Sequence, residues 1–239
     1  MKRPGTTLAI TFVAIAAIAV LHGVGATAKS QAPASAQAGP AVPPGQGAAS
    51  APPAPDQTKP QVLTVTTGTR ARYRVTEQLA GISFPSDAVG TTDAITGAIV
   101  LNPDGSFGPT SKIEVDLKTL STDQAMRDGY VRRNTLEVEK FPTLTIVPKR
   151  ANGLTMPLPS GMGAQAGFQL VTDMTLHGMT KEIVWTTVAT FASDSVSGSA
   201  KTTVDFAAFN LTKPSLARLV SVDDKIHLEI EFRASRRGQ

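Results

Sequence analysis

Residues 226–233 read IHLEIEFR, with an apolar residue at every even position and a polar residue at every odd position. Successive side chains of a β-strand point to opposite faces of the sheet, so this run predicts a strand with one apolar and one polar face. Residues 112–117, KIEVDL, alternate in the same way. Residues 168–176, FQLVTDMTL, also alternate, and Thr172 is the one polar residue on their apolar side. Such strands, wet on one side and dry on the other, are typical of an antiparallel sheet.

Weaker alternation elsewhere indicates more strands of the same kind. It is centred on the pairs Tyr73/Val75, Ile99/Leu101, Leu144/Ile146, Ile183/Trp185 and Val204/Phe206. Turns rich in Gly and Ser separate these runs, and residues 102–105 read NPDG, a turn sequence. Eight or nine strands with such turns predict an all-β domain over residues 61–234, either a closed antiparallel barrel or a sandwich.

The apolar register should fill or line the interior of this domain. We expect the inward side chains to include Val115, Leu117, Ile146, Phe168, Leu170, Met174, Leu176, Trp185, Leu228 and Ile230. The charged residues between them, Lys112, Glu114 and Asp116, should face outward.

One connection, Leu120–Lys140, breaks the alternation. Ser121–Gln124 has the spacing of a capping box, and Met126 and Tyr130 follow at a separation of four residues. We therefore expect a short helix in this connection, ended by the residues before Pro142, because the residue before a proline avoids helical geometry.

The N-terminus has the three zones of a secretory signal over residues 1–28. Lys2 and Arg3 supply the positive start, Leu8–Leu21 is almost wholly apolar, and residues 26–28 read ATA, a small-x-small cleavage site. An uncleaved membrane anchor is the alternative, but 14 helical residues span only about 21 Å of a hydrocarbon core near 30 Å. The sequence favours export to the periplasm with cleavage after Ala28.

Residues 29–60 are rich in Pro and Ala, with Val42 as their only large aliphatic residue. Such a segment cannot repay the entropy of ordering by burial, so we expect a disordered linker, either a spacer or a dispensable tail. Residues 235–239, with Arg236 and Arg237, are expected to form a disordered basic tail.

Composition excludes several classes of function. Cysteine is absent and there are three histidines, which excludes thiolate chemistry and argues against a histidine-rich metal centre. The pI of about 9.5 does not indicate nucleic-acid binding, because from residue 61 onward 19 Lys and Arg oppose 18 Asp and Glu. Motifs for a nucleophile elbow, a phosphate-binding loop or a zinc protease are missing, so no enzyme, cofactor or metal is expected.

Three segments, in this order, resemble the YceI-like family of exported bacterial proteins. They are VDLKTLSTD at 115–123, leading into Arg127-Asp128; LEVEKFP at 136–142; and MTLHGMTK at 174–181. The resemblance covers about residues 111–233. It implies a lipocalin-like antiparallel β-barrel of about eight strands that binds long apolar chains, notably polyisoprenoids such as quinone tails.

Two functions from different classes follow for the chain. The first is an exported carrier that holds a polyisoprenoid, prenyl quinone or other long-chain lipid inside the barrel. The alternative is a solid-cored barrel that acts through its surface on a partner in the cell envelope or as a stress factor. An elongated apolar cavity would favour the first and a filled interior the second.

If there is a chamber, the apolar register must wall it. We expect the ligand-binding residues to be Leu117, Ile146, Phe168, Leu170, Met174, Ile183 and Trp185. A polar headgroup would stay at the barrel mouth, near Asp123, Arg127, Asp128 and Tyr130. The simpler interpretation of Asp123 and Arg127 is an ion pair between residues four apart that stabilises the helix, with no role in ligand binding.

The remaining polar candidates have structural interpretations. His177 precedes Gly178 at the tip of an expected hairpin, where a turn is the first interpretation and a ligand contact the second. His227 lies on the polar side of its strand and should face solvent. Asp223-Asp224 lacks the further acidic residues of a calcium loop and is expected to form a turn.

Overall fold

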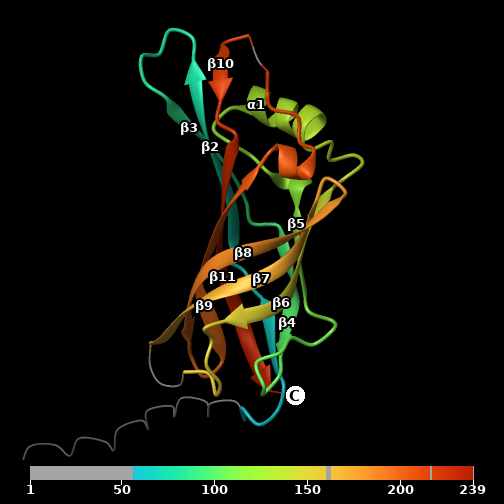
Figure 1. Cartoon of the computed structure of the whole chain (residues 1–239), viewed down its shortest axis with the longest axis vertical. Coiled ribbons are helices and arrows are strands. Elements are labelled where there is room, and N and C mark those ends of the chain that lie inside the picture. The colour runs from blue at the N-terminus through green and yellow to red at the C-terminus, as the bar shows by residue number, and fades with distance from the viewer. Residues whose placement is uncertain (1–55, 160–162, 216, 239) are drawn as a thin grey trace, which may run out of the picture. The chain divides into compact units, whose positions relative to one another are not determined.

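The computed structural model describes residues 56–159, 163–215 and 217–238, and most of them lie in strands (Figure 1). The strands are β1 (Gln61–Val65), β2 (Arg70–Leu79), β3 (Ser86–Thr92), β4 (Ile95–Leu101), β5 (Lys112–Asp116), β6 (Thr143–Asn152), β7 (Ala164–Leu176), β8 (Met179–Phe191), β9 (Ser195–Asp205), β10 (Leu219–Val222) and β11 (Lys225–Gly238). The helical elements are η1 (Leu117–Thr119), α1 (Ala125–Tyr130), η2 (Val131–Thr135) and η3 (Ala207–Phe209).

Eight of the strands close into an antiparallel barrel. Hydrogen-bonded neighbours follow the order β1-β4-β5-β6-β7-β8-β9-β11, and β11 pairs again with β1. Closure pairs the first and last strands of this ring with each other, so the ring has no terminal edge strand. The predicted all-β barrel of about eight strands is therefore confirmed, and the sandwich is excluded.

The remaining strands extend the wall at one end of the barrel. The long strand β11 pairs with β1 through residues 234–238 and with β2 through residues 227–231. Strand β2 in turn pairs with β3 and with the short β10. The connection that carries α1 lies at this same end (Figure 1), which we call the α1 end.

The predicted register of the strands is correct. Val115 and Ile146 are buried, while Lys112 and Glu114 lie outside and pair with each other at 3.0 Å. Six of the ten expected inward residues are buried; these are Val115, Leu117, Ile146, Met174, Leu176 and Trp185. The other four are only partly buried; these are Phe168, Leu170, Leu228 and Ile230. Since all four line internal cavities, their exposure reflects empty space inside the barrel.

A helix does occupy the Leu120–Lys140 connection, as predicted, but the expected capping box is wrong. Ser121 forms an antiparallel bridge with Thr91, which keeps the backbone extended there. The helix therefore starts only at Ala125, and Gln124 caps it without a side-chain hydrogen bond.

The C-terminal prediction also needs correction, because residues 235–238 are not a disordered tail. They continue β11 and pair with β1, so that Gly238 lies opposite Gln61. The side chain of Arg236 is buried, and its guanidinium donates to Gln61 Oε1 at 3.3 Å and to the Ala192 carbonyl at 3.2 Å. A run of basic residues suggests a solvated tail, but here pairing with strand β1 makes residues 235–238 part of the barrel.

The N-terminal predictions fall mostly outside the described residues. The expected signal segment, residues 1–28, and the linker up to residue 55 are not described. Residues 56–60 of the linker are described, and Gln57 exchanges two hydrogen bonds with the Leu158 backbone. Packing therefore starts before Gln61. None of the helices in the described part of the chain has the length and apolar character that crossing a membrane requires.

Candidate functional site

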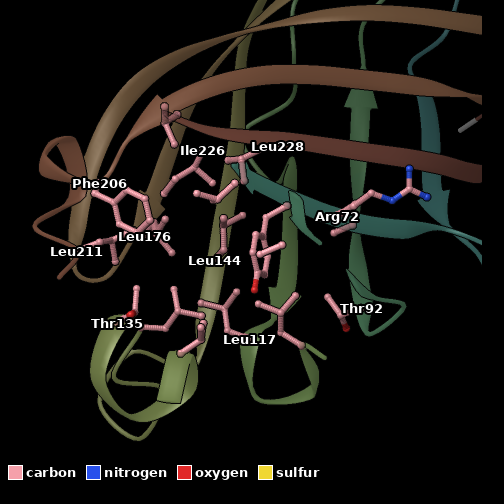
Figure 2. Close-up of a pocket in the computed structure, with 18 of the residues that line it drawn as sticks. Arg72, Thr92, Leu117, Thr135, Leu144, Leu176, Phe206, Leu211, Ile226 and Leu228 are labelled. Carbon is pink, nitrogen blue, oxygen red and sulfur yellow. The ribbon is translucent and has the colours of Figure 1, made fainter. Parts of the chain in front are cut away.

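The barrel interior contains two apolar cavities. Cavity 1, of about 130 Å³, lies toward the α1 end. Figure 2 shows how Leu117, Leu144, Leu176, Phe206, Leu211 and Ile226 surround it. These side chains come from strands β6, β7 and β11, from η1 and from the segment around η3. Cavity 1 is thus walled by the apolar register of the barrel and covered by the helical connection.

Cavity 2, of about 140 Å³, lies farther along the barrel, between β1, β4 and the strands β6–β9. Its apolar lining includes Leu63, Ile99, Phe107, Phe168, Leu170 and Phe191. The two threonines that line it use their hydroxyls on the protein backbone: Thr69 donates to the Arg233 carbonyl at 2.9 Å and Thr187 to the Trp185 carbonyl at 3.4 Å. Cavity 2 therefore offers only apolar contact to an occupant.

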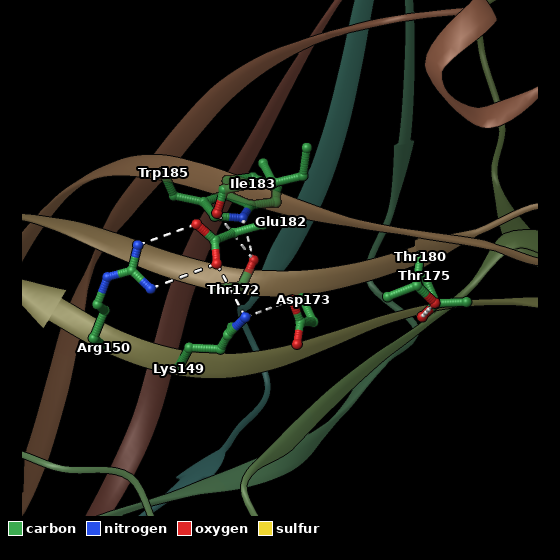
Figure 3. Close-up of polar contacts among 9 residues, drawn as sticks. All are labelled: Lys149, Arg150, Thr172, Asp173, Thr175, Thr180, Glu182, Ile183 and Trp185. Atoms are coloured by element: carbon green, nitrogen blue, oxygen red, sulfur yellow. Dashed lines mark hydrogen bonds and ion pairs between the residues drawn. The ribbon is translucent and has the colours of Figure 1, made fainter.

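Trp185 and Ile230 line both cavities, so these two side chains lie between the two spaces. The indole of Trp185 is 2% exposed, and its Nε1 donates to Thr172 Oγ1 at 3.1 Å (Figure 3). Thr172 is the polar residue that interrupts the apolar side of β7. This hydrogen bond orients the indole between the two cavities.

Cavity 1 carries polar groups that cavity 2 lacks. Tyr73 and Thr135 line it, and the Thr135 hydroxyl is buried without a hydrogen-bond partner. Burial raises the pKa of Tyr73 to about 12; the charge of Arg127 opposes this shift, and the nearby carboxylates add to it. The Tyr73 phenol is therefore neutral at physiological pH. Both groups suit an uncharged hydrogen-bonding partner.

A buried ion pair borders cavity 1. The Arg127 guanidinium contacts Glu77 Oε1 at 2.7 Å and Asp123 Oδ1 at 2.8 Å. The side chains of Arg127 and Glu77 are about nine-tenths buried, whereas Asp123 is mostly exposed. The Asp123–Arg127 pair was predicted from its spacing. Glu77 was not, because it lies 50 residues away on β2 and only the fold brings it to α1.

The other two residues expected at the barrel mouth serve the local structure. Asp128 is buried and accepts hydrogen bonds from the backbone N–H of Thr122 at 2.8 Å and from its hydroxyl at 2.7 Å. The Tyr130 hydroxyl accepts from the Ser215 backbone N–H at 3.3 Å. Neither lines cavity 1 or cavity 2.

The structure distributes the seven expected ligand-binding residues over three environments. Leu117 lines cavity 1; Ile146, Phe168 and Leu170 line cavity 2; Trp185 lines both. Met174 and Ile183 line neither cavity, and Met174 is fully buried among core side chains.

Several lining residues were not expected from the sequence. Tyr73 and Ile99 belong to alternating runs, so their register already indicated an inward side chain. Phe107 lies in the β4–β5 loop, where no periodic pattern marks it.

The histidine and aspartate candidates have structural roles. His177 has φ +52° and Gly178 φ +74°, as the tip of the β7–β8 hairpin requires. The Phe141 ring packs edge-on against the His177 imidazole, with the ring centroids 4.5 Å apart. This contact joins two of the segments that resemble the family, residues 136–142 and 174–181. His227 contacts Thr203 Oγ1 at 3.0 Å on the outer face. Asp223 accepts from the Lys225 backbone in a turn. No group of three or more potential metal-ligating side chains occurs within residues 56–159, 163–215 and 217–238.

Together, the fold and the cavities define an up-and-down antiparallel β-barrel with a hollow, apolar interior. The chain belongs to the YceI-like domain family, whose model matches residues 56–234.

Three solved structures share this fold at low sequence identity. A polyisoprenoid-binding domain from Saccharophagus degradans, implicated in plant cell wall breakdown, is 12% identical with a TM-score of 0.58, covering 73% of this chain and 97% of that one. BcnA of Burkholderia cenocepacia is 13% identical with a TM-score of 0.52, covering 70% and 96%. The YceI protein of Campylobacter jejuni is 15% identical with a TM-score of 0.52, covering 66% and 90%. No curated protein matches the chain.

Proposed function

We propose that this protein is a carrier that holds one long apolar lipid, a polyisoprenoid or prenyl quinone, inside its barrel. The observation that carries the proposal is the pair of apolar cavities on either side of Trp185 and Ile230 in the barrel interior. Two apolar spaces in succession suit an elongated hydrocarbon chain better than a compact ligand. The proposal is for binding and involves no chemical step.

The free energy gained by burying the ligand is large enough to allow tight binding. Burying about 500 Å² of apolar ligand surface yields about 12 kcal/mol at ~25 cal/mol per Å². Association costs roughly 4–15 kcal/mol, so tight binding requires that most of the chain be enclosed. The name of the Saccharophagus degradans domain supports the same class of ligand.

The polarity of the two cavities favours one orientation of the ligand. The headgroup would lie in cavity 1, near the Tyr73 phenol and the unpartnered Thr135 hydroxyl. The chain would pass beside Trp185 and enter cavity 2, where the polar side chains already bond the backbone. A buried hydroxyl without a partner costs free energy, and a ligand oxygen would remove that cost.

The charges around cavity 1 favour a neutral headgroup over a phosphate. Two arginines line cavity 1, and both are already paired with carboxylates: Arg127 with Glu77 and Asp123, and Arg72 with Glu229 at 3.3 Å. A phosphate would have to displace a carboxylate from Arg127 and would meet the remaining negative charge. A quinone carbonyl or an alcohol needs no such rearrangement.

The location that we propose for this carrier is the periplasm, on the basis of the signal-like sequence of residues 1–28. Intact mass of the protein isolated from the native cell envelope tests it. A mature chain starting near Lys29 is expected, and a full-length chain in the membrane fraction would indicate an anchor instead.

The decisive experiment uses the single tryptophan of the chain. Trp185 emission should shift when decaprenol or a prenyl quinone is added to delipidated protein, because the indole lines both cavities. Native mass spectrometry of the protein before delipidation should detect a co-purified lipid of the same class.

Two neighbouring positions supply matched variants. Leu170→Phe enlarges a side chain inside cavity 2, opposite Trp185. Val184→Phe makes a similar enlargement on the exposed outer face of the adjacent strand. We expect Leu170→Phe to weaken ligand binding at least tenfold and Val184→Phe to leave it unchanged, with circular dichroism showing both folded. Delipidated, folded wild type that binds no prenol or prenyl quinone by fluorescence or calorimetry would refute the proposal and favour a surface function.

A further inference from the structure

The large apolar side chains that are most exposed occur at one end of the described structure. Four exceed half exposure: Ile82 at 52%, Phe84 at 78%, Met126 at 84% and Val220 at 65%. The other large apolar residues classed as exposed, Val147, Val184 and Val188, are less than half exposed and lie on the outward faces of β6 and β8. Protruding apolar side chains gathered in one region mark an interaction surface more often than scattered ones do.

These four residues belong to the α1 end. Ile82 and Phe84 lie in the β2–β3 connection, Met126 in α1 and Val220 in β10, and these elements are grouped at one end of the barrel (Figure 1). A backbone hydrogen bond joins two of these elements, because the Ala80 N–H in the β2–β3 connection donates at 2.8 Å to the carbonyl of Arg218, just before β10. Ile82, Phe84, Met126 and Val220 are called the apolar rim below.

The apolar rim is continuous in sequence with the wall of cavity 1. Met126 precedes Arg127, which lines the cavity, and Val220 follows Leu219, which also lines it. The same short elements therefore present apolar side chains outward and line cavity 1 on their other side.

The charges near the rim favour an anionic surface. Arg133 and Arg218 are exposed, and neither forms an ion pair within the described part of the chain. Two carboxylates near these elements are already paired, Asp123 with Arg127 at 2.8 Å and Glu137 with Lys140 at 2.9 Å, whereas Asp223, directly after β10, forms no ion pair within the described residues. Unpaired arginines beside exposed apolar side chains match anionic headgroups above a hydrocarbon layer.

We infer that the apolar rim docks the protein on a lipid bilayer containing anionic lipids, so that cavity 1 faces the membrane surface. A fluid bilayer accepts side chains that protrude from three separate elements, whereas a protein partner or a second copy would need a surface shaped to fit them. On the proposed function, this docking places the cavity where its lipid is stored. The inference itself concerns the rim and holds for any occupant of the cavity.

The absence of cysteine allows the rim to be probed site by site in the full chain. Single cysteines replace Met126, Val220 or, as a control on the barrel wall, Val184, and each is labelled with the environment-sensitive fluorophore NBD. Vesicles of phosphatidylethanolamine and phosphatidylglycerol at 3:1 are then added. Emission should shift to the blue and intensify at positions 126 and 220 and stay unchanged at position 184.

This local readout does not depend on any attachment through the N-terminal segment. An equal response at position 184, or no response at positions 126 and 220, would overturn the inference. A blue shift that grows with protein concentration in the absence of vesicles would identify a second copy as the occupant and overturn it as well.

A second measurement tests the contribution of the side chains. Ile82→Ser/Phe84→Ser should lower the vesicle partition coefficient at least about tenfold, since the loss of even one buried apolar side chain removes about a tenfold factor. The matched pair Val184→Ser/Val188→Ser should leave it unchanged. Both pairs should retain the Trp185 response to soluble prenol, so a failure of docking and a failure of lipid binding are read separately. Equal loss in both pairs would contradict a role for the rim.

Discussion

Trp185 Nε1 donates a hydrogen bond to Thr172 Oγ1 at 3.1 Å across strands β7 and β8, and the indole lies between the two cavities. Thr172 is fully buried, and it interrupts an otherwise apolar register. A buried indole N–H requires an acceptor, and the exception in the sequence pattern provides it. The bond therefore explains a polar residue in an apolar place and ties it to the candidate site.

Replacing Thr172 with valine should destabilise the protein by about 1–3 kcal/mol, because it leaves the indole N–H buried without an acceptor. Urea denaturation followed by circular dichroism measures the change. Thr172→Ser keeps the hydroxyl and should lose less stability than the valine variant. Equal stability of the valine variant and the wild type would contradict the structural role of this hydrogen bond.

Arg127→Met should destabilise the fold by about 3–5 kcal/mol, because Glu77 then stays buried without its cation. The double variant Glu77→Leu/Arg127→Met should recover much of this loss. Asp123→Asn removes only the exposed partner and should cost less than about 1 kcal/mol. If Asp123→Asn cost as much as Arg127→Met, the burial of the Glu77–Arg127 pair would not be the cause.

Tyr73 should make stability fall between about pH 10 and pH 12. Burial raises its pKa from 10.0 to about 12, so in this window the unfolded chain loses the phenol proton more readily than the folded protein. Below pH 10 the phenol is neutral in both the folded and the unfolded states, and Tyr73 does not change the free energy of unfolding with pH. As the pH rises to 12, the free energy of unfolding should fall by on the order of 2 kcal/mol. Tyr73→Phe should remove this part of the pH dependence. With two tyrosines in the chain, the difference in tyrosinate absorbance between wild type and this variant gives the pKa directly.

Two strand glycines should respond oppositely to alanine. A Cβ on Gly198 would lie 2.0 Å from the Val188 carbonyl oxygen, so Gly198→Ala must displace backbone and should cost about 1–3 kcal/mol. A Cβ on Gly167 meets nothing within 4 Å, and Gly167→Ala should be neutral or stabilise by about 0.4–1 kcal/mol. Thermal unfolding of the two variants measures the contrast. A similar melting temperature for both would show that β8 and β9 lie farther apart at Gly198.

Much of the fold was predictable because strand alternation is a local property. In β11 and β5, a side chain two residues along the chain returns to the same face, so the sequence alone assigned the inner and outer sides of the wall. The short helix was also predictable, since its connection lacks that alternation. The position of its first residue was not, because the Thr91–Ser121 bridge holds the chain extended up to that point.

For the candidate site, the sequence predicted which side chains face the barrel interior, but not where the cavities lie. Leu117, Leu170 and Trp185 were assigned to the apolar wall from periodicity, and they do line the cavities. Met174 has the same pattern and lies in solid core. Period two tells which face a side chain occupies, but not whether another side chain or empty space lies opposite.

The sequence by itself therefore determined the antiparallel strands, the inward face of each strand and the resemblance to a family of β-barrel proteins. The tertiary structure decided what depends on ring closure: the empty space around Trp185, the meeting of Glu77 with Arg127, and the pairing of residues 234–238 with β1. The physical reason is range. Alternation is set by neighbouring residues, whereas cavity volume and buried ion pairs arise from residues 50 or more positions apart that only closure of the barrel brings together.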